Sequence, residues 1–189
     1  MKKEALLIVD IQNDYFPGGN MELDSMEAAA KNAQRVLEFF RTENKPVFHI
    51  RHLSSSPGAT FFLPATFGAE IHHSVTPKNN EPVIEKHYPN CFRETSLQEQ
   101  LNESGLEKIT ICGAMSHMCI DTTVRAAFDL GFDCRVVSDA CATRKMEFGG
   151  IKVKAYQVHA AFMAALSVPF AEIVETNSLI NQGLVKDEF

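Results

Sequence analysis

The chain has no long apolar run and no concentration of positive charge, and both absences exclude classes of function. The apolar segment LLIVDI, residues 6–11, is interrupted by Asp10, so it resembles neither a membrane span nor the apolar region of a signal peptide. The 18 Lys and Arg residues are scattered and outnumbered by 24 Asp and Glu, whereas a nucleic-acid-binding surface gathers its basic residues. We therefore expect neither a nucleic acid nor a membrane as partner.

Zinc and disulfide patterns are also missing. The five cysteines form no CxxC pair and no Cys/His zinc spacing; they are Cys91, Cys112, Cys119, Cys134 and Cys141. Their number is odd and no export signal is visible, so we expect reduced thiols and a cytoplasmic location. No internal repeat or low-complexity tract is present.

What the sequence does contain is a regular alternation of apolar strands and helical patterns. With 189 residues, close to half of them apolar, we expect one domain over residues 1–189. Strands are predicted at 4–11, 47–52, 82–86, 108–114, 133–140 and 171–176. This alternation predicts an α/β fold, a doubly wound three-layer sandwich of Rossmann-like type around a six-stranded, mostly parallel sheet.

Helices are predicted between these strands. Asp24 and Glu27 resemble a capping box for a helix that extends to about Asn44, and Thr95 with Gln98 resembles a second one for a helix that ends at Gly105. A third helix follows Cys119 and ends at Gly131. A long helix over residues 147–166 and a short C-terminal helix complete the pattern.

Residues 53–80 form an excursion that is too long for an ordinary connection between a strand and a helix. Phe61, Phe62, Leu63 and Phe67 make it too apolar for a solvated loop. We expect it to cover the core or a subunit contact, and it is compatible with a role as pocket wall.

Three residues stand at the ends of predicted strands, where ligands bind in open parallel sheets. Asp10 ends the first strand, Lys86 ends the third, and Cys119 follows the fourth. Taken singly, Asp10 could cap a turn, Lys86 could be solvated, and Cys119 could be inert core. For Cys112 and Cys134, inside apolar strands, the core interpretation is favoured, and Cys141 stays open.

Taken together, the three residues make an activated nucleophile. A helix N-terminus and a nearby ammonium both favour thiolate. A carboxylate placed to accept the thiol proton completes the arrangement. The sequence alone does not show that the three residues meet.

The segments LLIVDIQNDYF, VIEKHYPNCF, GAMSHMCIDTTVRAAFDLGF and VVSDACAT resemble the isochorismatase-like cysteine hydrolases, a superfamily that includes nicotinamidases and N-carbamoylsarcosine amidohydrolases. The resemblance implies Asp10 as general base and acid, Cys119 as nucleophile, and Lys86 as the cation between them. It also implies a cis peptide between Ala114 and Met115. The backbone N–H groups of Met115 and Cys119 would then form an oxyanion hole.

The resemblance further implies acyl transfer, in which Cys119 attacks a small amide or ureido compound and water hydrolyses the thioester. Phe16, Gln12 and His117 are candidate substrate-binding residues, and a homo-oligomer, dimer or tetramer, is expected. Nicotinamidases of this superfamily carry a metal site with Asp-x-His on the second strand. This chain has HIRH at 49–52 without an aspartate, so we predict no metal, whether His49, His52, His72 or His73 is considered, and no cofactor.

Two alternatives stay open. One is nicotinamidase activity. The other is a redox-sensing or binding protein that uses Cys119 without hydrolysis, although a sensor thiol does not need a proton-accepting carboxylate.

Overall fold

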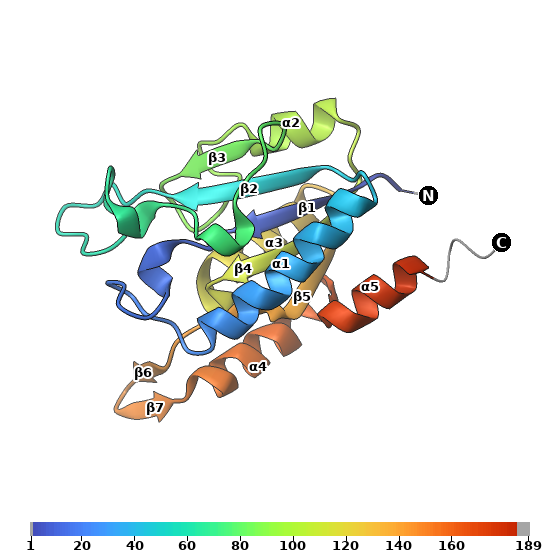
Figure 1. Ribbon diagram of the computed structural model, residues 1–189. Helices are drawn as coiled ribbons and strands as arrows, with labels where there is room; N and C mark the ends of the chain where they lie inside the picture. The colour runs from blue at the N-terminus through green and yellow to red at the C-terminus, as the bar shows by residue number, and fades with distance from the viewer. Residues whose placement is uncertain (1, 185–189) are drawn as a thin grey trace.

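A six-stranded parallel sheet forms the centre of the computed structural model, which describes residues 2–184 (Figure 1). The strand order is β3-β2-β1-β4-β5-β8. The strands are β1 (Glu4–Val9), β2 (Val47–His52), β3 (Val83–Lys86), β4 (Lys108–Ala114), β5 (Asp133–Ala142) and β8 (Glu172–Val174). The fold class is confirmed, and the sheet is parallel throughout.

Helices cover both faces of this sheet. One apolar cluster joins the sheet to α1 (Met26–Thr42) and α5 (Thr176–Leu184), and the other joins it to α2 (Leu97–Glu103), α3 (Asp121–Asp129) and α4 (Ala155–Leu166). Residues 5–9 of β1 are fully buried because both faces are covered, which explains the continuous apolar run in the sequence. None of the helices within residues 2–184 combines the length and the apolar character that a bilayer-spanning segment needs.

The first two helices begin later than the sequence predicts. Ser25, at φ 59°, is the N-cap of α1, and no side-chain cap is present there. Asp24 instead pairs through its backbone N–H with the carbonyl of Thr143 at 3.0 Å. The predicted capping box at Asp24 is therefore wrong. At α2, the hydroxyl of Thr95 accepts from the Leu97 N–H at 3.3 Å, and the helix begins at Leu97.

The long helix predicted over residues 147–166 is wrong in its first part. An antiparallel hairpin of β6 (Met146–Phe148) and β7 (Ile151–Val153) precedes α4, and it projects from the molecule (Figure 1). Gly149 and Gly150, at φ 58° and 79°, form the turn. Two consecutive positive φ angles are typical of a two-residue hairpin turn and exclude a helix. The glycine pair was the signal for this turn in the sequence.

The excursion after β2 folds back onto the chain that follows β1. Phe62 is buried and its ring centroid lies 4.6 Å from that of Tyr15. The backbone N–H of Phe62 donates to the carboxylate of Asp14 at 2.6 Å. Phe67, by contrast, is 75% exposed. The excursion thus covers core with part of its apolar residues only.

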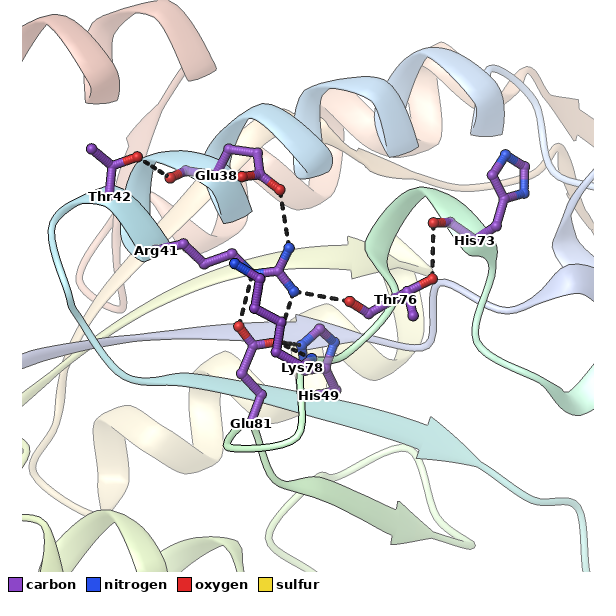
Figure 2. Close-up of polar contacts among 8 residues, drawn as sticks. All are labelled: Glu38, Arg41, Thr42, His49, His73, Thr76, Lys78 and Glu81. Carbon is purple, nitrogen blue, oxygen red and sulfur yellow. Dashed lines mark hydrogen bonds and ion pairs between the residues drawn. The ribbon is translucent and has the colours of Figure 1, made fainter.

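A buried carboxylate fastens the far end of the excursion to the sheet. Glu81 accepts two hydrogen bonds from the guanidinium of Arg41, at 2.7 and 2.8 Å, and one from the backbone N–H of Lys78 at 2.8 Å (Figure 2). Nε2 of His49, on β2, lies 2.9 Å from the same carboxylate. Arg41 also donates to the Thr76 carbonyl at 2.9 Å. Glu81 therefore ties the end of α1, the middle of β2 and the start of β3 together.

The Glu81→Gln substitution is expected to lower the free energy of unfolding by about 2 kcal/mol, because it replaces charge-assisted hydrogen bonds with neutral ones. Burial alone would raise the pKa of Glu81, but Arg41, the Lys78 amide and His49 outweigh it and lower the pKa from 4.5 to about 2. The contribution is therefore present above pH 4.5 and is lost as pH falls toward 2. Urea unfolding of both proteins across this range measures the difference.

Glu85→Gln is the matched control, since Glu85 forms an exposed pair with Arg51. An exposed pair contributes about 0–1 kcal/mol. Equal losses in the two variants would contradict the role of Glu81.

Candidate active site

Three neighbouring strands bring the candidate residues to one edge of the sheet. Asp10 directly follows β1, at φ 52°, and Lys86 is the last residue of β3. Between them lies β2, whose last residue His52 pairs in register with Lys86. Loops that follow β1 and β2 lie at the same end of the sheet (Figure 1). A parallel sheet places these carboxyl ends together by construction.

The fourth strand reaches the site through a close contact with the first. Gly113, at φ 125°, lies so near β1 that an added Cβ would stand 1.9 Å from the Val9 carbonyl oxygen. The chain then passes through the cis peptide Ala114–Met115, as the resemblance implies. A π-helical turn, Ser116–Ile120, follows and leads directly into α3. Cys119 lies inside this turn and not at the first residue of a helix.

The Lys86 ammonium is the centre of the site. Its Nζ lies 2.7 Å from Oδ2 of Asp10, 3.4 Å from Sγ of Cys119 and 2.9 Å from Nδ1 of His52. The side chains of Asp10 and Lys86 are 0% exposed, and Cys119 is 5% exposed. The structure thus brings Asp10, Lys86 and Cys119 together in one buried cluster, and their catalytic roles stay predictions.

The surroundings set the resting charges of this cluster. Burial raises the pKa of the Cys119 thiol well above its usual value, the Asp10 charge raises it further, and Lys86 only partly offsets both. Burial would lower the pKa of Lys86, but the charges of Asp10 and Cys119 outweigh it and raise that pKa. The sequence pointed to a thiol whose ionisation is favoured. The structure instead favours a neutral thiol beside a carboxylate–ammonium pair.

The Asp10 carboxylate lies near the thiol, with ligand-type atoms of Asp10 and Cys119 within 4.8 Å of one another. Neither of its carboxylate oxygens accepts a well-aligned hydrogen bond from any described residue, despite the short contact with Lys86. Both oxygens are fully buried, and neither has a hydrogen-bond donor among the described residues. A carboxylate with unused acceptor capacity next to a thiol is the arrangement that general-base catalysis requires.

The backbone around Met115 bears on the predicted oxyanion hole. The N–H of Met115 donates to no acceptor within residues 2–184, while the Met115 carbonyl accepts from the N–H groups of Met118 and Ile120 at 3.0 and 3.2 Å. These bonds fix the turn that carries Cys119. The joint action of the Met115 and Cys119 N–H groups on an oxyanion stays a prediction.

The three candidate substrate-binding residues have different surroundings. Phe16 is buried and stacks on the ring of His72, with centroids 3.6 Å apart. Nδ1 of His117 lies 2.5 Å from the hydroxyl of Thr143, and its ring is half-buried. Contact of these two residues with a substrate stays a prediction.

Gln12 is fully buried and uses its side chain on the backbone. Its Nε2 donates to the carbonyls of His52 and Ala69, at 2.9 and 2.8 Å, and its Oε1 accepts from the His52 N–H at 2.8 Å. These bonds hold β2 and the excursion in place. They favour a positioning role for Gln12. A contact between Gln12 and a substrate stays a prediction.

His52 is the site residue that sequence reasoning missed. It was considered only as a metal ligand, yet it contacts Lys86 directly. The sequence signal was available, because His52 ends the second strand as Lys86 ends the third. Ligand-type atoms of Asp10, His52 and Cys119 lie within 4.8 Å of one another, but the cation that stands against all three is the Lys86 ammonium.

The comparisons with known proteins identify the family of the chain. The family model described as Isochorismatase domain matches residues 4–178. This chain belongs to the isochorismatase family. Over 176 residues it is 49% identical to an uncharacterised isochorismatase family protein, YddQ, of Bacillus subtilis. The alignment covers 93% of this chain and 98% of YddQ.

A solved structure and a named enzyme extend the similarity. A putative isochorismatase hydrolase from Oleispira antarctica matches with a TM-score of 0.92 and 47% identity, covering 95% of this chain and 97% of that one. Nicotinamidase 3 of Arabidopsis thaliana is 28% identical over 190 residues, covering 94% of this chain and 87% of that protein. The recognition of an isochorismatase-like hydrolase fold from the sequence is confirmed.

The four histidines considered as metal ligands in this isochorismatase-family chain have different surroundings. His49 is buried against Glu81, far along β2 from the site residue His52. Nδ1 of His52 faces Lys86, and Nδ1 of His72 lies 2.9 Å from the Ser74 hydroxyl. His73 is exposed. Each of these contacts engages one ring nitrogen only, and Nδ1 of His49 has no hydrogen-bond partner within residues 2–184, so the expected absence of a metal stays a prediction and we derive no step through a metal.

Lys86→Met is expected to lower the free energy of unfolding by about 3 kcal/mol, because it leaves the Asp10 carboxylate buried without a counter-charge. The double variant Asp10→Asn/Lys86→Met should recover part of this loss. Urea unfolding of the wild type, both single variants and the double variant measures the coupling. Additive losses would mean that the pair does not interact.

Proposed function

We propose that the chain is a cysteine-dependent hydrolase that cleaves a C–N bond, amide or ureido, of a small molecule through a thioester intermediate. One observation carries the proposal: a single buried ammonium touches both a carboxylate with free lone pairs and a thiol. The resemblance of the three strand-end motifs to cysteine hydrolases supports it. So does the named activity of the nicotinamidase relative, because nicotinamide is a carboxamide.

The first half of the reaction forms the thioester. Asp10 accepts the proton of the Cys119 thiol, and the thiolate that forms is held by Lys86, 3.4 Å away. Sulfur attacks the carbonyl carbon, and the carbonyl oxygen becomes an oxyanion held by the N–H groups of Met115 and Cys119. The C–N bond then breaks as protonated Asp10 gives its proton to the leaving nitrogen.

The second half releases the acid. Asp10, again a carboxylate, takes a proton from a water molecule, and the hydroxide that results attacks the thioester carbon. The C–S bond breaks, and the Cys119 sulfur regains its proton from Asp10. The cluster returns to its resting charges, because each proton taken up is later given back. Lys86 keeps its charge throughout, as its raised pKa requires.

Two features bear on partners and substrates. The hairpin and the adjoining helix expose large apolar side chains, Phe148 at 90% and Ile151 at 70%, which supports the expected homo-oligomer.

The cavity of about 680 Å³ beside Arg41 and Gln100 lies at the amino-terminal ends of the strands. It is remote from Cys119, and we assign it no role in this reaction.

Cys119→Ala is expected to reduce hydrolysis by at least about 10³-fold, since it removes the sulfur that lies 3.4 Å from the Lys86 ammonium. The measurement is ammonia or amine release from a panel of small carboxamides and ureido compounds. Cys134→Ala is the matched control, because it removes a buried thiol distant from the site, and it should keep full activity. Undiminished turnover by Cys119→Ala would end the proposal.

The same panel separates the alternatives. Nicotinamide with and without added zinc or iron tests nicotinamidase activity, which absence of ammonia release in both conditions would exclude. A stable sulfenic acid at Cys119 under mild peroxide, with no hydrolysis of any compound, would favour a redox-sensing protein instead.

A further inference from the structure

The Lys86 ammonium has three N–H groups and three acceptors around it. Nδ1 of His52 and Sγ of Cys119 lie at hydrogen-bond distance from Nζ, at 2.9 and 3.4 Å, and Oδ2 of Asp10 forms an ion pair with it at 2.7 Å. An ammonium on a four-carbon stem is otherwise free to rotate among partners. With one ion pair and two hydrogen bonds, the position of Nζ between the carboxylate and the sulfur is held from three sides.

His52 is itself held rigidly. Its backbone N–H and carbonyl both bond to the buried side chain of Gln12, at 2.8 and 2.9 Å. On the other side, its strand position is paired in register with Lys86. The hydrogen bonds from Gln12 and the pairing with β3 restrict the backbone of His52. Its Nδ1 therefore has a defined position beside the ammonium.

We propose that His52 is a positioning residue, whose Nδ1 holds the Lys86 ammonium in place between Asp10 and Cys119. This inference rests on the proposed function, since it assigns His52 to the same reaction. Asp10 and Cys119 exchange a proton during that reaction, so the negative charge moves from one to the other. A neutral third acceptor keeps the ammonium beside both without drawing it toward a third charge.

The charge state of His52 fits this role. Burial lowers the pKa of His52, and the Lys86 ammonium lowers it further, to about 4. The ring is therefore neutral near pH 7, with its proton on Nε2, because Nδ1 accepts from Lys86. Among described residues, Nε2 has no hydrogen-bond partner and is not sealed from solvent.

Other titratable groups face the cluster. Burial raises the pKa of Cys91 to about 12 and raises the pKa of Tyr15 well above its usual value, so both are neutral. His87, next to Lys86 in sequence, is exposed, and its Nδ1 lies 2.8 Å from the Leu53 carbonyl. The titratable groups that act on His52 by charge are Lys86, Asp10 and, with the smallest effect, His87.

Two substitutions of His52 test its two ring nitrogens, Nδ1 and Nε2, one at a time. His52→Asn keeps an acceptor at the position of Nδ1 and removes the distal nitrogen, whereas His52→Gln keeps a polar group at the distal position and removes the proximal acceptor. The measurement is the rate of Cys119 alkylation by iodoacetamide as a function of pH, followed by mass spectrometry of the Cys119 peptide. It needs no substrate, so it succeeds or fails separately from the hydrolysis assay.

We expect His52→Gln to slow alkylation of Cys119 roughly tenfold at neutral pH and to move the pH profile upward by about one unit, the effect of one hydrogen bond to a charged group. His52→Asn should stay within about twofold of the wild type, since it restores the acceptor. His87→Asn, the same change at the neighbouring exposed histidine, should leave the profile unchanged.

Three results would overturn the inference. They are equal profiles for the Gln and Asn variants, a wild-type profile in both, or a shift in His87→Asn of the same size as in His52→Gln. Thermal unfolding of each variant identifies any loss of folding. His52→Asn could keep the wild-type alkylation profile, with a shifted profile in His52→Gln, while no amide is hydrolysed. In that case His52 positions Lys86, and the proposed function is wrong.

Discussion

The buried ammonium of Lys86 is the constraint on which the active-site end of this fold depends. A charge out of water costs several kcal/mol unless it is paired and its hydrogen bonds are satisfied. Lys86 meets that demand with a carboxylate from the end of β1, an imidazole from the end of β2 and a thiol from the turn after β4. Four segments distant in sequence must therefore come together correctly before this side chain can be buried.

The same ammonium is central to the proposed role of Cys119 as nucleophile, because the pKa of this thiol is raised. A proton that moves from Cys119 to Asp10 changes no net charge, because one anion replaces another beside Lys86. Burial keeps the thiol neutral at rest. In the proposed proton transfer, the free-energy cost of a buried thiolate is offset by the Lys86 ammonium, which already lies beside the sulfur. In the proposed reaction, reactivity would come from the geometry of three groups more than from a lowered pKa of one.

The two histidines of β2 have different partners at different positions along the strand. His49, in the middle of the strand, joins Glu81 and Arg41, which fasten the end of the excursion (Figure 2). His52, at the end of the strand, faces Lys86. Because side chains alternate along a strand, residues three apart lie on opposite faces. Two histidines of one short motif, HIRH, therefore have unrelated surroundings.

The sequence by itself determined the order of strands and helices, since continuous apolar runs and amphipathic periods depend on local patterns. It also located Asp10, Lys86 and Cys119 at strand ends, because a charged or reactive residue there interrupts an apolar run. Only the tertiary structure decided that His52 contacts Lys86, that burial keeps the Cys119 thiol neutral, and that Gln12 bonds to backbone. Each of these depends on which strands are neighbours and on how much water is excluded, and neither is encoded within a single segment. The hairpin at 146–153 is the intermediate case: its glycine pair was visible, but the surrounding apolar residues fitted a helix equally well.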